Sequence, residues 1–160
     1  MKADGTTYNL LFVCTGNTCR SPMAAAIARA ILDGRGWRHV AVRSAGTAAA
    51  AGSPASAHAI DVARENQLEL ESHGSQPLTE DLVGWADLIL VMGPAHLRAV
   101  EDLGGAGRAA LVADFALGDN AGRAVADPFG GDHEAYSDTF RQLTEAVEAA
   151  LDRLAPILAP

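Results

Sequence analysis

A chain of 160 residues is long enough for one compact domain with a single sizeable core. Its net charge of −8 argues against a protein that binds nucleic acid, because contacts with a phosphate backbone need a basic face. The five histidines are scattered, with no pair at the spacing of helical metal ligands, so no metal ion or other cofactor is expected.

Apolar strand-like runs alternate with helix-like segments, which predicts a single-domain α/β fold with a parallel sheet over 1–160. In chain order, the expected elements are a strand at 8–13, a turn at 14–20, a helix at 21–32, a strand at 40–43, a loop at 44–52, a helix at 53–66, a helix at 80–85, a strand at 88–92, a helix at 94–103, a strand at 109–112, a loop at 115–126 and a helix at 138–158. The first apolar run is too short to span a membrane, and the N-terminal layout is not that of a signal peptide. We therefore expect a cytoplasmic protein with no membrane partner.

Several helix ends carry residues that favour a boundary. Ser21-Pro22 and Ser53-Pro54 each read as a capping serine followed by a proline at the first helical position. Thr79 can cap the short helix that follows it, and Pro156 is expected to limit the last helix.

The segment from Val13 to Pro22 carries the strongest chemical signal. It is a tight loop between a buried strand and a helix, and successive backbone N–H groups in such a loop form an anion-binding nest. Gly16 permits a backbone conformation that other residues resist, and Arg20 can hold two phosphate oxygens with its planar fork. The field that binds phosphate also favours the thiolate form of Cys14, so the loop predicts nucleophilic attack on phosphorus and a phosphocysteine intermediate.

The sequence fits other kinds of loop less well. A nucleotide-binding P-loop needs the pattern G-x-x-x-x-G-K-[ST], which is absent. The glycines of 105–107 precede a strand instead of following one, which indicates a surface turn. A simple strand–helix turn with an incidental buried thiol is disfavoured by the combination of Gly16, Asn17 and Ser21 with Cys14 and Arg20.

The sequence from Cys14 to Met23, Cys-x-Gly-Asn-x-Cys-Arg-Ser-Pro-Met, resembles the phosphate-binding loop of the low-molecular-weight protein phosphatases. The likeness continues in order along nearly the whole chain, through the segments 44–47, His73, 86–92 and Asp127-Pro128. The resemblance implies a four-stranded parallel sheet in the order 2-1-3-4, with helices on both faces. It places the loop at the carboxyl end of the first strand, where such folds bind ligands.

The resemblance also implies roles for single residues. The phosphate-binding loop comprises Thr15, Gly16, Asn17, Thr18, Cys19 and Ser21 between the catalytic Cys14 and Arg20. Asn17 holds this loop in shape through hydrogen bonds to Ser44 and His73, and Ser21 can donate to the sulfur of Cys14.

Protonation of a leaving group needs a carboxylic acid from another loop, and the resemblance assigns that role to Asp127. Asp132 is the alternative, followed by Asp114 and Asp119. Cys19 is a candidate redox partner for Cys14, because the two cysteines share one tight loop and the resemblance implies that they lie close in space. Such a pair is a poor framework for a fold and more often does chemistry.

The expected partners are phosphorylated proteins, and the pocket residues bear on which side chain is phosphorylated. Tyrosine-directed members usually carry Ile or Leu at the position of Thr18 and paired aromatics at the position of Phe129-Gly130. Thr18 and the segment 75–80 resemble the protein-arginine phosphatases, so phosphoarginine is favoured over phosphotyrosine. An arsenate reductase would need cysteines after Cys19, and a non-catalytic phosphoprotein-binding module would not need both Cys14 and a placed acid.

Overall fold

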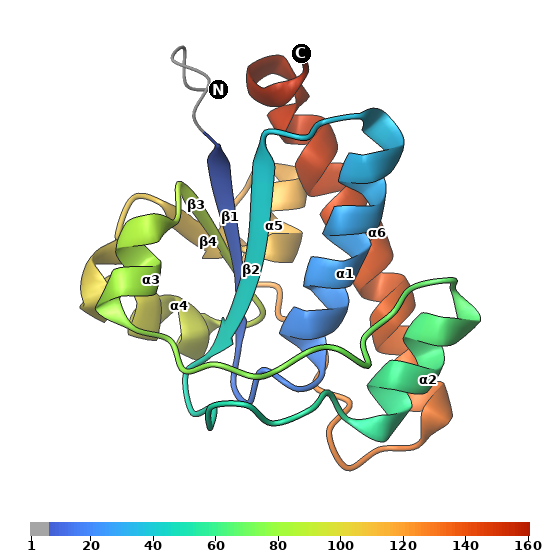
Figure 1. Ribbon diagram of the computed structural model, residues 1–160. Helices are drawn as coiled ribbons and strands as arrows, with labels where there is room; N and C mark the ends of the chain where they lie inside the picture. Colours follow the sequence, from blue (N-terminus) through green and yellow to red (C-terminus); the bar gives the residue numbers. More distant parts are fainter. Residues whose placement is uncertain (1–6) are drawn as a thin grey trace.

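The computed structural model describes residues 7–160 and places a parallel sheet between two layers of helices (Figure 1). The strands are β1 (Tyr8–Cys14), β2 (Val40–Gly46), β3 (Leu88–Val91) and β4 (Ala109–Leu111). They lie in the order β2-β1-β3-β4 and all pair in parallel, which confirms the predicted topology. Because both faces of the sheet are covered here, β3 and residues 10–14 of β1 are buried and apolar throughout.

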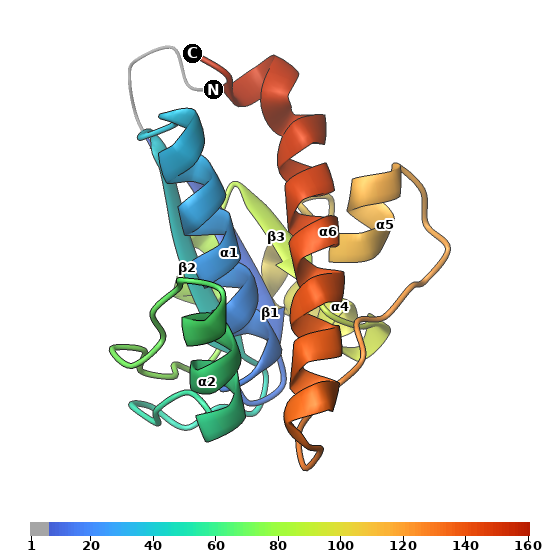
Figure 2. The same cartoon turned by 90° about the vertical axis from the view of Figure 1, so that its right-hand side faces the viewer.

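The larger helical layer is built on the two longest helices, α1 (Arg20–Arg35) and α6 (His133–Leu158), which lie side by side (Figure 2). The helices α2 (Ala57–Glu65) and α5 (Val112–Leu117) complete this layer. Alternate strand residues, among them Leu10, Phe12 and Leu90, point into the core beneath it.

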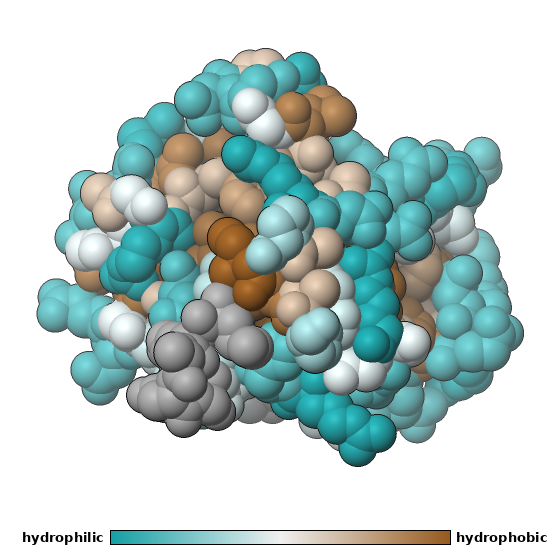
Figure 3. Space-filling view, turned by 90° about the horizontal axis from the view of Figure 1, so that it is seen from above, coloured by the Kyte–Doolittle hydropathy of each residue, from teal (hydrophilic) through white to brown (hydrophobic). Residues whose placement is uncertain are grey.

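The opposite layer consists of α3 (Glu80–Trp85), α4 (Pro94–Val100) and a short π-helical turn, η1 (Glu101–Gly105), that continues α4. The remaining strand residues, such as Leu11, Val13 and Ile89, form a second core here. Thr79 caps α3 as predicted, with its hydroxyl accepting a hydrogen bond from the N–H of Leu82. The carboxyl ends of the strands point downward in Figure 1. Figure 3 looks onto the opposite end of the molecule, where polar side chains surround a small apolar area.

Two predicted helix starts were wrong. The first, α1, begins at Arg20, so Ser21 lies inside its first turn and caps nothing, because its hydroxyl is directed at Cys14 instead. The second, α2, begins at Ala57 and not at Ser53. The backbone of Ser53 is paired with Ser75. The N–H of Ser75 donates to the carbonyl of Ser53, and the N–H of Ser53 donates to the hydroxyl of Ser75. This pairing keeps the segment extended.

The C-terminal region also differs from the prediction. Residues 112–117 form α5 where a strand end and a loop were expected. Helix α6 begins at His133, not Asp138, because the carboxylate of Asp132 caps it by accepting from the N–H of Ala135. Pro156 does not end the helix but lies within its last turn, where its missing N–H removes a single helical hydrogen bond.

Residues 1–6 lie outside the described range. Within residues 7–160, no helix is both long enough and apolar enough to cross a membrane.

Candidate active site

The candidate site is the loop between β1 and α1, at the carboxyl ends of the strands. Strand β1 lies between β2 and β3, so the connections from β1 to β2 and from β2 to β3 run in opposite directions across the sheet, and the end of β1 is its topological switch point. Open α/β sheets bind ligands at such a crevice. Arg20, the first residue of α1, and the preceding loop therefore surround the start of a long helix, where backbone N–H groups are free to bind an anion.

The loop is held in place by its carbonyl oxygens. Four of them bond to residues outside the loop. The N–H of Thr47 donates to the carbonyl of Cys14, and the N–H of Ala48 donates to that of Thr15. The N–H of Ser56 donates to the carbonyl of Thr18, and the ring Nε2 of His73 donates to that of Asn17. Because these carbonyls are bonded outside the loop, its N–H groups are not needed to hold it in place and are available to an anion.

Asn17 is the residue that shapes the loop from within. It is fully buried and has a positive φ of 56°, a conformation that asparagine tolerates better than most residues. Its Nδ2 donates to the hydroxyls of Ser21 (2.8 Å) and Ser44 (2.9 Å). Its Oδ1 accepts from the N–H of Gln76 at 2.9 Å, and its carbonyl lies 2.7 Å from Nε2 of His73. The structure thus brings Ser44 and His73 to Asn17, and it adds Gln76, which the sequence did not indicate.

Cys14 and Ser21 lie against each other at the bottom of the site. The Cys14 sulfur is 2.9 Å from the Ser21 hydroxyl oxygen, and both residues are buried. Since that oxygen accepts from Asn17, the hydroxyl hydrogen of Ser21 is available to the sulfur. The other acceptor within reach, the carbonyl of Ala45, is farther away at 3.4 Å. A donor in this position stabilises a negatively charged sulfur.

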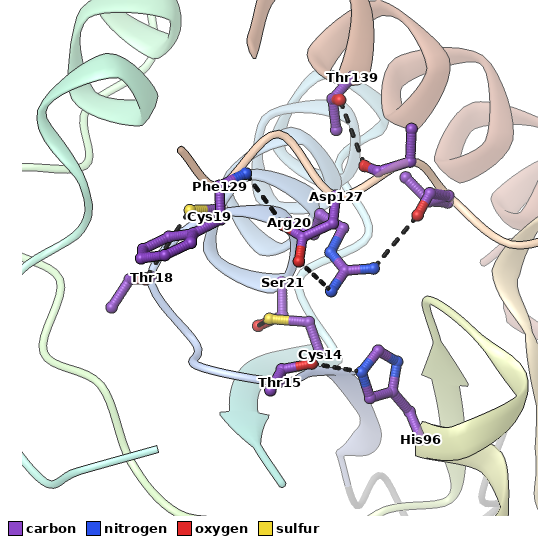
Figure 4. Close-up of polar contacts among 12 residues, drawn as sticks. Cys14, Thr15, Thr18, Cys19, Arg20, Ser21, His96, Asp127, Phe129 and Thr139 are labelled. Atoms are coloured by element: carbon purple, nitrogen blue, oxygen red, sulfur yellow. Dashed lines mark hydrogen bonds and ion pairs between the residues drawn. The ribbon is translucent and has the colours of Figure 1, made fainter. Parts of the chain in front are cut away.

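Arg20 and Asp127 meet across the opening of the site (Figure 4). The two side chains approach to 3.4 Å, and the guanidinium also donates to the carbonyl of Val125 at 3.2 Å. Arg20 is buried, whereas the side chain of Asp127 is 50% exposed. A second carboxylate oxygen of Asp127 accepts from the N–H of Phe129 at 3.1 Å, which fixes the turn that presents the acid.

These groups enclose a cavity of about 190 Å³. Its lining consists of Cys14, Thr15, Gly16, Thr18, Cys19, Arg20, Asp127 and Phe129. The thiol, the guanidinium and the carboxyl group thus face one small space. A larger cavity of about 320 Å³ lies elsewhere, over the outer edge of β2, and its lining includes neither cysteine.

The other carboxylates considered from the sequence hold structure elsewhere. Asp132 caps α6. Asp114 is buried and accepts from the backbone N–H groups of Gly122 and Arg123, and Asp119 pairs with the Arg123 side chain. Of the four candidates, Asp127 is the one that lines the cavity.

The structure adds residues around the loop that the sequence patterns did not indicate. His96 of α4 is buried, and its Nε2 lies 2.8 Å from the hydroxyl of Thr15. Burial lowers the pKa of His96, the charge of Arg20 lowers it further, and Asp127 acts in the opposite direction. A signal was available, because His96 follows β3 at the same edge of the sheet as the loop.

Cys19 has partners of its own behind the loop. Its sulfur lies 3.3 Å from the hydroxyl of Tyr136 on α6 and 3.5 Å from that of Ser56. Burial and then the hydrogen bond with Cys19 raise the pKa of Tyr136. Among residues 7–160, no group of three or more His, Cys, Asp or Glu is placed to hold a metal ion.

A thiol, a guanidinium and a carboxyl group around a loop at the carboxyl ends of a parallel sheet are the groups that cysteine-dependent phosphatase chemistry requires. The chain belongs to the low molecular weight phosphotyrosine protein phosphatase family, whose profile it matches over residues 9–159. This confirms the resemblance drawn from the loop motif.

The chain is similar to proteins described with two different activities. The protein-arginine-phosphatase of Bacillus subtilis (strain 168) is 37% identical over 148 residues, which cover 91% of this chain and 96% of that protein. The probable low molecular weight protein-tyrosine-phosphatase EpsP of Ralstonia solanacearum is 36% identical over 145 residues, covering 91% and 94%. The structure of YwlE arginine phosphatase from Geobacillus stearothermophilus superposes with a TM-score of 0.84 at 35% identity, covering 93% of this chain and 94% of that one.

Proposed function

We propose that this protein removes phosphoryl groups from phosphoarginine side chains of proteins, with Cys14 as the nucleophile. The observation that carries this choice is Thr18, whose side chain forms part of the wall of the catalytic cavity. Relatives described as protein-arginine phosphatases, 37% and 39% identical to the chain, support the same choice.

The first chemical step forms a sulfur–phosphorus bond. The thiolate of Cys14 attacks the phosphorus while the loop N–H groups and the fork of Arg20 hold the phosphoryl oxygens. The phosphorus–nitrogen bond breaks, its electron pair stays on the guanidino nitrogen, and Asp127 gives that nitrogen a proton. The half-exposed position of Asp127 suits this transfer, because its carboxyl group lies at the opening where the leaving group must sit.

The second step hydrolyses the phosphocysteine. The carboxylate of Asp127 takes a proton from a water molecule, the oxygen of that water attacks phosphorus, and the bond to sulfur breaks. Inorganic phosphate leaves and the thiolate is regenerated, stabilised by the Ser21 hydroxyl 2.9 Å away. A solved variant of YwlE arginine phosphatase is described as carrying a phosphorylated active-site serine, which supports a covalent phosphoenzyme route.

Thr18 suits a guanidinium because it offers both a methyl group and a hydroxyl. The N–H groups of a phosphorylated guanidine need acceptors once the cavity has taken them out of water, and an unpaired donor costs about 1–3 kcal/mol. A threonine hydroxyl can accept from one of them. An aliphatic residue at the same place cannot.

Phosphotyrosine is the second candidate, and Phe129 favours it. This ring lines the cavity, is 75% exposed and lies at the opening, where it could stack on a phenyl group (Figure 4). The similarity to EpsP, described as a probable tyrosine phosphatase, supports the same alternative.

A side-by-side assay on phosphoarginine and phosphotyrosine proteins tests the proposal, with Thr18→Ile and Thr18→Val as variants. Thr18→Val keeps the shape and removes only the hydroxyl, so it should lower kcat/KM for phosphoarginine alone. Thr18→Ile adds an apolar branch that can pack on a phenyl ring, so the preference ratio should shift toward phosphotyrosine by about 10²-fold.

Hydrolysis of p-nitrophenyl phosphate should survive in both variants, which separates a change of specificity from loss of folding. A wild-type protein that prefers phosphotyrosine would overturn the substrate proposed here. Unchanged preference ratios in both variants would show that Thr18 does not select the substrate.

A further inference from the structure

His96 lies beneath the phosphate-binding loop without touching the reacting groups. Its ring nitrogen Nε2 is 2.8 Å from the hydroxyl oxygen of Thr15, the residue that follows the nucleophile (Figure 4). Thr15 in turn lines the catalytic cavity. The contact therefore joins α4, on one side of the sheet, to the side chain that stands next to Cys14 in the chain.

The surroundings of His96 hold its ring in the neutral form. The residue is 6% exposed, and its other nitrogen, Nδ1, is buried without a hydrogen-bond partner. Burial and the charge of Arg20 both lower the pKa of His96. A protonated imidazolium would bury two N–H donors there, and only the one on Nε2 would have a hydrogen-bond partner. Burying an unpaired donor and a charge costs more than burying the neutral ring.

Which ring nitrogen of neutral His96 carries the proton follows from the lack of a partner at Nδ1. If Nδ1 carried it, an N–H donor would be buried with no acceptor, and orphaned donors are rarer in proteins than under-used acceptors. The proton therefore belongs on Nε2, which donates it to the Thr15 oxygen. The hydroxyl hydrogen of Thr15 is then not engaged with His96 and can point elsewhere.

We propose that His96 is a positioning residue that turns the Thr15 hydroxyl into a hydrogen-bond donor facing the phosphoryl group in the cavity. The proposal rests on the proposed phosphatase chemistry of this site but not on which side chain is phosphorylated. With Nε2 donating to its oxygen, the Thr15 hydroxyl directs its hydrogen away from His96, so that hydrogen is free for a phosphoryl oxygen in the cavity that Thr15 lines. The phosphoryl oxygens thereby gain a side-chain donor in addition to the loop N–H groups and Arg20.

Binding of inorganic phosphate tests this without any phosphoprotein substrate. Its inhibition constant against p-nitrophenyl phosphate hydrolysis is measured for wild type, His96→Leu, Thr15→Val and the double variant. Each single variant should weaken phosphate binding by about tenfold, the scale of one hydrogen bond to a charged group. The double variant should be no weaker than either single one, because both changes remove the same donor. KM should rise in parallel with the inhibition constant.

Two controls distinguish positioning from a packing role. His96→Gln keeps an N–H donor near the place of Nε2 and should restore most of the phosphate affinity lost in His96→Leu. A packing role would instead give losses that add in the double variant and no restoration by glutamine, and either result would overturn the proposal.

A measurement on the unaltered protein keeps the proposal testable if the variants do not fold. Nitrogen-15 spectra of the histidine rings should show His96 neutral near pH 7, with a protonated Nε2 and a bare Nδ1. A ring protonated on Nδ1, or on both nitrogens, would overturn the proposal. If the inhibition constants and the spectra agree with these expectations but the protein does not hydrolyse phosphoarginine, only the substrate proposed above is wrong.

Discussion

Asp127 and Asp132 stand at the two ends of one short loop, yet the structure gives them different surroundings. Asp132 accepts from the N–H of Ala135 at the start of α6, whereas Asp127 faces Arg20 and the cavity. The loop before Asp127 is anchored at both sides. The N–H of Val125 donates to Met92, and the carbonyl of Ala126 accepts from Thr139. These contacts place the acid without using its carboxyl group.

Asp127→Asn should lower turnover on substrates with poor leaving groups by about 10²- to 10⁴-fold, because an amide cannot supply the proton. The loss should be smaller for p-nitrophenyl phosphate, whose leaving group departs readily as an anion. Asp132→Asn is the matched control, since asparagine also caps helices and should leave turnover near that of wild type. Equal losses on both kinds of substrate, or a comparable loss in the control, would mean that Asp127 is not the acid.

Cys19 provides a second test at the level of single residues. Both cysteines are free thiols, and the Cys19 sulfur contacts Tyr136 and Ser56. We expect mild hydrogen peroxide to oxidise Cys14 and Cys19 to a disulfide, with one peroxide reduced to two water molecules. Intact-mass analysis should show the loss of two hydrogens, reversed by a thiol reductant. If Cys19→Ala resists irreversible inactivation as well as wild type does, Cys19 does not protect Cys14.

Sequence patterns could indicate some of these residues and not others, for a physical reason. Cys14, Asn17, Arg20 and Ser21 lie within one loop, so their spacing alone carries information. Gln76, His96 and Tyr136 reach the loop from segments about 60 to 120 positions away, and each makes its contact through tertiary packing. No local pattern of hydrophobicity or capping marks such a contact, and for His96 the available signal is its place after β3, at the same edge of the sheet as the loop.

At the scale of elements, the end of β2 fits closely against the loop between β1 and α1. A Cβ atom added to Gly46 would lie 2.4 Å from the carbonyl oxygen of Thr15 and 2.9 Å from the N–H nitrogen of Asn17. Both neighbours are backbone atoms, which cannot rotate away as a side chain could. The last residue of this strand must therefore be glycine for the loop to keep its shape.

Gly46→Ala should lower the free energy of unfolding by about 1–3 kcal/mol, the usual cost of overpacking, and should weaken phosphate binding. Gly34→Ala is the matched control. It lies in α1 with open space around its would-be Cβ, so the same change there should stabilise the helix by up to about 1 kcal/mol. Urea unfolding and phosphate inhibition constants measure both effects. A Gly46→Ala protein as stable as wild type would show that the loop can move away from β2.

The helix boundaries show where prediction from local signals failed. Ser21 and Ser53 each precede a proline, yet neither caps a helix. The Ser21 hydroxyl is used by Cys14 and Asn17, and the backbone of Ser53 is paired with Ser75. The same serine can cap a helix or hydrogen-bond to a distant part of the chain. At both positions the tertiary contacts, and not the local sequence, determined which of the two it does.

At the scale of the whole molecule, the sheet could be predicted and for a simple reason. Strands buried on both faces must be apolar throughout, and helices that alternate with them allow only parallel pairing with crossovers. The strand order came from the family resemblance, and the structure has the same order. Element ends and long-range contacts depend on packing that no such rule describes.

The charge of the molecule opposes the charge of its proposed substrate. The chain has 20 acidic and 12 Lys or Arg residues, a net charge of −8, and the phosphoryl groups of phosphoarginine and of p-nitrophenyl phosphate are also negatively charged near pH 7. The attraction that overcomes this repulsion is local, from Arg20 and the loop N–H groups, and Arg20 is only 7% exposed. Salt screens distant exposed charges much more than buried contacts, with a screening length of about 30 Å at 0.01 M and about 8 Å at 0.15 M.

We therefore expect kcat/KM for p-nitrophenyl phosphate to rise a few-fold between about 0.01 M and about 0.15 M ionic strength, as screening removes the long-range repulsion. The salt should have a bulky anion, so that it does not compete for the cavity. A double variant, Glu145→Gln with Glu148→Gln, removes two exposed carboxylates of α6 and changes the net charge from −8 to −6. Its activity should be higher at low salt and should respond less to added salt. A kcat/KM that falls as salt is added would mean that the positive potential of the site extends beyond its cavity and dominates the approach of the substrate.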